Sequence, residues 1–341
     1  MENKEKYFKI VNPHGHHGMI YHEGYNEDTL PFNPKGNCEP GGIYFASNDI
    51  LSFLNYGTDV YEVHPVGTIY ENPGDIKKYK AHALNMQFVG AIDDVKTLEY
   101  LIKNGADIHV NEDCALRKYA EIGNLKLVKY LIKNGANIHA AYDGALYNSI
   151  NNNHLETAKY LIENGANVHV DDERALRLYT EKGDLKFVKF LVEHGANINN
   201  NQAHALRNAA EYGHFELAKY LIEQGADIHA NCDDALQASA KNGHFEITKL
   251  LIEHGANVHA LNEYSLQLAA ENGHPKVAKY LLKQGADIHA HNDIAFLRAA
   301  EYGNLKTVKC LVENGADIHA NRDYAFKWGL PEVIEYLKSL K

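Results

Sequence analysis

Histidine is the chemically active residue that recurs at a fixed spacing in this sequence. Its positions, thirty residues apart with one interruption at Asn199, are His109, His139, His169, His229, His259, His289 and His319. A zinc ion needs its ligands within about 2.1 Å, whereas units stacked at this spacing lie about 10 Å apart, as packed helices do. Neighbouring histidines therefore cannot share one ion, and we predict a hydrogen bond within each loop instead. If the rings are bound neutral, the array loses stability below about pH 6.5.

A second group of histidines lies in a glycine-rich stretch near the start of the chain: His14, His16, His17 and His22. It offers imidazole ligands for zinc, but no cysteine lies at ligand spacing, so a glycine-rich loop is the favoured interpretation. The four cysteines are widely separated and form no CxxC pair, which is typical of reduced thiols in a cytosol-like compartment. We predict no metal and no cofactor.

Composition limits the classes of function. The chain has 341 residues, 45% of them hydrophobic, and a formal net charge of −11. That hydrophobic fraction favours a packed core over disorder, and the acidic balance argues against binding to a nucleic-acid backbone. No segment approaches eighteen consecutive apolar residues, so we expect no membrane-spanning helix. We predict a cytoplasmic monomer that binds neither nucleic acid nor membrane.

The elements that carry the histidines repeat with the same period. Glycine recurs every thirty residues, at Gly105, Gly135, Gly165, Gly195, Gly225, Gly255, Gly285 and Gly315. A fixed period of 20–50 residues indicates a stacked array, in which neighbouring units bury faces that one unit cannot bury alone.

One unit, "NCDDALQASAKNGHFEITKLLIEHGANVHA" at residues 231–260, shows the internal pattern. Asp233 is predicted to be the N-cap of a short first helix, and Gly243 to end it in the left-handed conformation. A second helix follows, with apolar residues such as Ile247 and Leu251 at helical spacing, and Gly255 ends it. Each unit is therefore helix, turn, helix and loop.

The stretch "GHFELAKYLIEQGADIHA" at residues 213–230 resembles the "GH…V…LL…GAD.NA" half of the ankyrin repeat. That family's unit has about 33 residues and a "TPLH" stretch. Here the unit has thirty residues and "DDALQASA" stands in that place, which favours a shorter turn over the family's β-hairpin finger. The thirty-residue form is similar to ankyrin proteins of giant, amoeba-infecting viruses of the mimivirus type. This resemblance implies a viral protein that acts on host proteins, in the host cytoplasm.

We therefore predict a mostly α fold: an ankyrin-repeat α-solenoid preceded by a small α+β domain. The predicted domains are 1–80 for the α+β domain and 81–341 for the array. Within the array we expect a degenerate first unit at 81–110, seven thirty-residue units at 111–320 and a capping unit at 321–341. In the first domain, "GGIYFA" and "DVYEVHPVGTIY" have the composition of strands, and "NDILSFLNYG" that of a short helix.

Candidate contact residues come from the variation between units. Leucine or phenylalanine is retained at the core position of each first helix, whereas the positions two before it and just before the inter-helix glycine vary freely. Tyr and Arg are the favoured hot-spot types at such positions, so we predict that a protein partner contacts Arg174, Arg207, Tyr212, Tyr264, Tyr302 and Tyr324. Neutral variation on a solvated face is the alternative. The predicted function is a non-enzymatic protein-interaction scaffold that binds along its loops and first helices.

A different function remains open for the first domain. "IYHEG" followed by "GGIYFA" resembles the early motifs of ADP-ribosyltransferases, and that resemblance implies that His22 and Tyr44 would hold NAD. The later catalytic glutamate of that family has no convincing counterpart here. The alternative to a pure scaffold is therefore an NAD-using enzyme, or a decayed relative of one, that the repeats target. A structural component of a viral particle is the third possibility.

Overall fold

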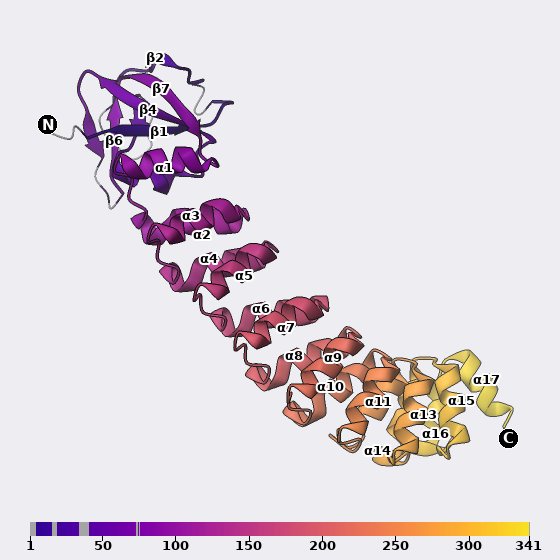
Figure 1. The fold of residues 1–341 in the computed structure, drawn as a ribbon. Helices are drawn as coiled ribbons and strands as arrows, with labels where there is room; N and C mark the ends of the chain where they lie inside the picture. Colours follow the sequence, from indigo (N-terminus) through magenta and orange to yellow (C-terminus); the bar gives the residue numbers. More distant parts are fainter. Residues whose placement is uncertain (1–4, 16–18, 34–40, 73, 75, 341) are drawn as a thin grey trace. The chain divides into compact units, whose positions relative to one another are not determined.

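The computed structural model describes residues 5–15, 19–33, 41–72, 74 and 76–340. The chain divides into two compact units, Met1–Val170 and Asp171–Lys341, which we describe separately (Figure 1). Within the described residues, no helix is both long enough and apolar enough to span a membrane.

Two small antiparallel sheets occupy the start of the first unit (Figure 1). One has the strand order β1-β4-β7-β2 and the other β3-β6-β5. Their strands are β1 Tyr7–Val11, β2 Gly24–Glu27, β3 Ile43–Phe45, β4 Asp59–Val66, β5 Tyr70–Asn72, β6 Lys78–Ala81 and β7 Ala83–Ala91. Apolar side chains from both sheets, such as Val11, Phe45 and Val63, form one buried cluster. The predicted strands in "GGIYFA" and "DVYEVHPVGTIY" are confirmed, and "NDILSF" forms a short 3-10 helix, η1 Asn48–Phe53.

Strand β7 differs from the sequence prediction. Residues 81–110 were expected to be a degenerate repeat unit that begins with a helix, but Ala83–Ala91 pair with β4 on one side and β2 on the other. The physical reason is a two-residue period that the helical interpretation overlooked: Leu84 and Met86 are buried, while Asn85 and Gln87 are exposed. The expected boundary after residue 80 falls inside β6, and the first helix of the repeats is α1, Val95–Lys103.

The helices of the first unit form two rows. The first-helix row contains α2 Val110–Glu121 and α4 Ala140–Asn151, and the second-helix row contains α1, α3 Leu125–Lys133 and α5 Leu155–Glu163. Second helices are strongly amphipathic and bury leucines such as Leu131 and Leu161 completely. First helices carry small residues such as Ala120 at their contacts, which lets neighbouring helices approach closely.

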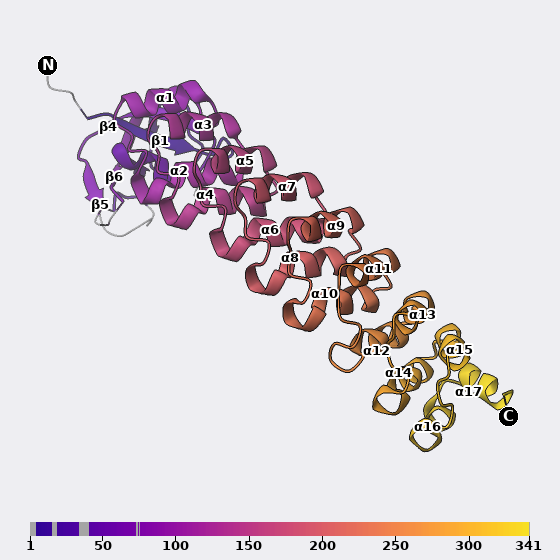
Figure 2. The ribbon, with the colours of Figure 1, turned by 60° about the horizontal axis from the view of Figure 1, so that its bottom comes forward.

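The second unit repeats this arrangement (Figure 2). Its first helices are α6 Val170–Lys182 (from Asp171 onward), α8 Asn200–Glu211, α10 Ala230–Lys241, α12 Tyr264–Glu271, α14 Ala290–Glu301 and α16 Ala320–Trp328. Its second helices are α7 Leu185–Glu193, α9 Phe215–Glu223, α11 Phe245–Glu253, α13 Pro275–Lys283, α15 Leu305–Glu313 and α17 Pro331–Lys338. Each row packs helix against helix, for example α8 on α10 and α9 on α11.

A left-handed turn precedes the regular part of each first helix. In α10, Asn231, Cys232 and Asp233 have φ values of 50°, 59° and 62°. Between residues 95 and 340 no strand occurs in the loops, so the expected replacement of the hairpin finger by a shorter turn is confirmed. The predicted N-cap role of Asp233 is wrong: its carboxylate accepts from the backbone N–H of Asn257 in the following loop, at 2.8 Å.

Candidate partner-binding site

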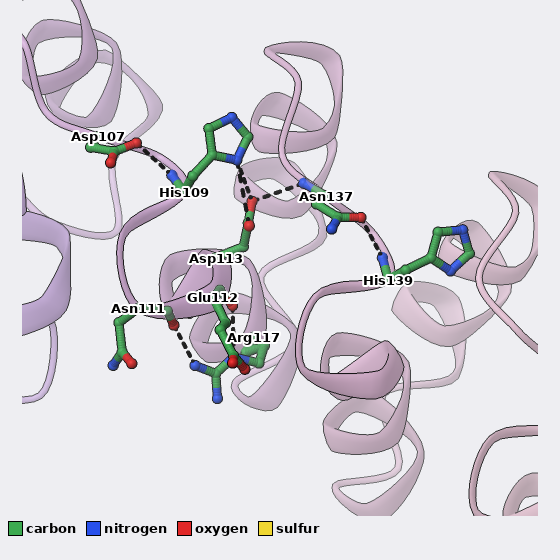
Figure 3. A network of polar contacts seen from close by, with 8 residues as sticks. All are labelled: Asp107, His109, Asn111, Glu112, Asp113, Arg117, Asn137 and His139. Atoms are coloured by element: carbon green, nitrogen blue, oxygen red, sulfur yellow. Dashed lines mark hydrogen bonds and ion pairs between the residues drawn. The ribbon is translucent and has the colours of Figure 1, made fainter.

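The repeated loops are held by a carboxylate that lies four residues after each histidine, and Figure 3 shows one example. The backbone N–H of His109 donates to Oδ1 of Asp107 at 2.8 Å. The Nδ1 atom of the His109 ring lies 3.2 Å from Oδ1 of Asp113, and the same oxygen accepts from the backbone N–H of Asn137 at 2.8 Å. We call this arrangement, in which one carboxylate joins its own loop to the next, the carboxylate clasp.

The clasp recurs along the array. Its inter-loop bonds run from the backbone N–H to the carboxylate in Asn137–Asp113, Asn167–Asp143, Asn197–Glu173, Asn257–Asp233 and Asp317–Asp293, at 2.8 to 3.0 Å. All of these carboxylates are buried. A ring nitrogen that faces a carboxylate must carry a proton, since the carboxylate can only accept. The predicted loop hydrogen bond of the histidines is therefore confirmed. The expected loss of stability below about pH 6.5 stays a prediction.

The interruption of the histidine series at Asn199 has a structural counterpart. Position 203, which carries the carboxylate elsewhere, is alanine in this unit. Oδ1 of Asn199 accepts from the backbone N–H of Asp227 at 2.8 Å, and its Nδ2 donates to the carbonyl of Gly225 at 3.2 Å. One asparagine thus replaces both the histidine and the carboxylate, which shows what the clasp must supply: an acceptor for the next loop.

A polar cleft of about 380 Å³ lies over α6 and α8. We call it the arginine cleft, because Arg174, Arg177 and Arg207 line it together with His204 and Tyr212. The whole chain contains six arginines, so half of them gather here. Of the predicted contact residues, the structure brings together Arg174, Arg207 and Tyr212.

The charges in the arginine cleft are partly paired. Arg207 lies 3.2 Å from Glu211 and 3.0 Å from Asp234, and Arg177 donates to the carbonyl of Asp171 at 3.1 Å. The Tyr212 hydroxyl donates to Glu181 at 3.4 Å. These contacts hold the three side chains in place, and those of Arg177 and Arg207 remain 26% and 37% exposed.

Burial is the main cause that lowers the pKa of His204, and the cations of Arg207 and Arg177 lower it further. The ring is therefore neutral near pH 7. At that pH it presents a neutral polar group beside the arginines and adds no further positive charge.

The other predicted contact residues lie away from this cleft. Tyr264, Tyr302 and Tyr324 are not part of its lining; the first two are 40% and 53% exposed and the third is half-buried. Sequence reasoning missed Arg177 and His204, although the spacing of three residues between Arg174 and Arg177 places both on one helix face. It also missed Tyr142, a turn residue that is 94% exposed.

The residues of the alternative prediction, His22 and Tyr44, belong to segments of the two different sheets of the first domain. His22 precedes β2, in the four-stranded sheet, and its ring Nδ1 lies 2.8 Å from the carbonyl oxygen of Glu23. Tyr44 is in β3, in the three-stranded sheet, with the ammonium of Lys80 4.8 Å from the centre of its ring. Of the proposed zinc cluster, His16 and His17 lie outside the described residues. Among the residues that the structure describes, no three metal-binding side chains converge on a point.

The paired helices and linked loops define an ankyrin-repeat protein. The chain belongs to this family: the family model for ankyrin repeats (3 copies) matches residues 86–172, 168–232, 229–292 and 266–340.

Relatives come from Acanthamoeba polyphaga mimivirus, as the thirty-residue repeat predicted. Putative ankyrin repeat protein R229 is 35% identical over 120 residues, which cover 32% of this chain and 38% of that protein. Uncharacterized protein R869 is 36% identical over 132 residues, 34% of this chain and 93% of that protein. Putative ankyrin repeat protein R868 is 33% identical over 115 residues, 31% of this chain and 56% of that protein. The matches therefore span less than two thirds of R229 and of R868.

Proposed function

We propose that this protein is a non-enzymatic module that binds a protein partner through its first helices and loops. The observation that supports this proposal most directly is the arginine cleft, where Arg174 and Tyr212, at positions that vary between units, lie together with Arg207. Residues that maintain the array, such as Leu206 and Leu236, are fully buried and retained. Variation at accessible positions beside a retained core is the pattern expected of recognition rather than packing.

The module acts as a monomer in the cytoplasm, and if the protein is viral, like the relatives it matches, its partner is a protein of the host cell. The array supplies the contact surface.

The test is an affinity capture from amoeba lysate with the full chain, read by mass spectrometry. A matched variant carries Arg174→Gln, Arg207→Gln and Tyr212→Ala, and a control variant carries Arg117→Gln and Arg298→Gln, outside the arginine cleft. The expected result is a partner that the cleft variant loses and the control retains. A partner that both variants retain equally contradicts recognition through this cleft.

The enzyme alternative is tested separately by calorimetric titration of the full chain with NAD. Heat of binding that is lost with His22→Ala or Tyr44→Phe would transfer the function to the first domain. Absence of binding leaves the scaffold proposal as stated.

A further inference from the structure

We propose that the arginine cleft binds an oxyanion side chain of a peptide segment, a glutamate or a phosphorylated residue, with Arg207 as the central donor. This inference rests on the proposed function, because it names the chemistry of the partner at the same site.

Arg207 does not bond to the left-handed turn of its own unit, as its counterparts in other units do. At the equivalent position, Arg117 donates to the carbonyl oxygens of Asn111 and Glu112 in its own left-handed turn (Figure 3). Arg177 donates to the carbonyl of Asp171 in the same way. Glutamine performs this role in two further units, in the bonds Gln237–Cys232 at 2.6 Å and Gln267–Asn262 at 2.8 Å.

Arg207 makes no such bond to its own turn at residues 201–203 within the part of the chain that the structure describes. Its guanidinium turns instead to Glu211 and to Asp234 of the next first helix. The side chain that elsewhere supports the turn is therefore held by two carboxylates at the cleft here.

The donors of Arg207 are not fully used. Guanidinium carries five N–H donors in a planar fork. The Nε atom of Arg207 is buried and, among the described residues, has no aligned hydrogen-bond acceptor although Asp234 lies 3.0 Å away. Because Nε is buried against Asp234, a ligand oxygen in the cleft would use the outer N–H donors of the guanidinium, whose side chain is 37% exposed. Carboxylate and phosphate match the guanidinium fork because both can accept two parallel hydrogen bonds.

The overall acidity of the protein does not oppose such a ligand. The formal net charge of −11 is spread over the whole chain, and exposed charges beyond about 8 Å are largely screened at physiological ionic strength. Within the cleft, three arginines face Glu181 and Glu211. Asp234 also pairs with Arg207 at 3.0 Å and Asp171 lies 3.8 Å from Arg177, so the carboxylates are at least as many as the arginines. A bound oxyanion must therefore replace one of these carboxylates on its guanidinium, and contacts at hydrogen-bond distance determine binding.

The experiment observes the arginines directly. The full chain is labelled with ¹⁵N-arginine, and the side-chain Nε–H signals are recorded during titration with acetylated, amidated pentapeptides. Three probes share one frame, Gly-X-Gly-X-Gly, with X as glutamate, phosphoserine or glutamine. Arg117 and Arg298 are internal controls, because they lie outside the arginine cleft.

We expect the signals of Arg174, Arg177 and Arg207 to shift with glutamate or phosphoserine and not with glutamine, and the tighter-binding probe identifies the natural oxyanion. Arg207→Gln should weaken that binding about tenfold or more, as loss of a charge-assisted hydrogen bond does, whereas Arg117→Gln should leave it unchanged. Melting curves establish that both variants are folded, and Arg174→Gln provides a second test if Arg207→Gln is not.

Two results would overturn the inference: no shift with either anionic probe, or equal shifts at all arginines, which indicate general screening. A protein partner that is captured by the full chain, depends on Tyr212 and survives Arg207→Gln would also overturn it while leaving the proposed function intact.

Discussion

The carboxylate clasp can be tested by removing it in one unit. In the clasp of Asp233, Oδ1 accepts from the backbone N–H of Asn257 at 2.8 Å and faces Nδ1 of His229 at 3.1 Å. Asp233→Ala removes both contacts at once. We expect the free energy of unfolding to fall, because the N–H of Asn257 loses an acceptor that its surroundings do not replace.

The magnitude follows from burial. The side chain of Asp233 is 6% exposed and that of His229 is 62% exposed. The contact with the ring is therefore largely solvated and contributes little, about 0–1 kcal/mol as for exposed ion pairs. A buried donor left without an acceptor costs about 1–3 kcal/mol. We expect a total loss of about 2–3 kcal/mol, dominated by the backbone bond.

The chain itself supplies the rescue. His229→Asn combined with Asp233→Ala copies the arrangement at Asn199 and Ala203, where asparagine accepts from the loop 28 residues later. The double variant should recover at least half of the loss. Both variants place alanine in the same left-handed turn, so the strain of that substitution cancels in the comparison.

Two measurements check this prediction. Urea unfolding followed by circular dichroism gives the stability change, provided that the slopes of the variants agree. Hydrogen exchange at the amide of Asn257 gives a local readout: protection should be lost in Asp233→Ala and regained in the double variant. If the double variant is as unstable as the single one, or if the amide of Asn257 stays protected throughout, the clasp does not hold the loop.

Three further predictions concern single sites. Burial, Arg207 and Arg177 lower the pKa of His204 from its usual value of 6.5. On acidification the unfolded chain therefore takes up this proton first, and the free energy of unfolding should fall as the pH drops below about 6.5. Thermal melts at pH 7.5 and 5.5 should show a smaller loss of stability for His204→Gln. Burial alone would raise the pKa of Glu62, but hydrogen bonds from Tyr100 and Lys6 outweigh it and lower that pKa. The ionised Glu62 therefore stabilises the fold at neutral pH, and this stabilisation is lost as the pH falls through the lowered pKa. Tyr100→Phe should reduce the free energy of unfolding by about 1 kcal/mol near pH 7 and make it depend less on pH in acid. In urea unfolding, Gly213→Ala should be more destabilising than Gly225→Ala. A Cβ added at Gly213 would lie 2.6 Å from the ring of His244, whereas one added at Gly225 would meet nothing within 4 Å. Because φ is positive at both positions, the backbone strain is common to both variants.

The repeat was predictable because its signals are local and reinforce one another. Thirty-residue spacing, small residues on the first helices and glycine at positive φ all indicate the same unit. Strand β7 was missed because its nine residues precede the helical array and were interpreted with the helical period of that array. Their buried and exposed side chains alternate instead, and they pair with β2 and β4, which are distant in sequence. The role of Asp233 was missed for a related reason: a good N-cap residue and a clasp look alike until the next loop, 24 residues later, is placed beside it.

In this array, departures from the repeat carry more information about function than the repeat itself. At Asn199 and Ala203 two substitutions occur together and preserve the bond to the next loop, so this departure maintains structure. At Arg207 the departure is of the opposite kind: the residue type is shared with Arg117 and Arg177, but the bond to the turn is absent and the side chain faces the arginine cleft. Arg207 has exchanged its contact to the turn for ion pairs at the cleft, and this exchange is what supports a role in recognition. That reasoning, rather than exposure alone, separates Arg207 from Tyr264 and Tyr302, which are exposed but show no contact that distinguishes recognition from neutral variation.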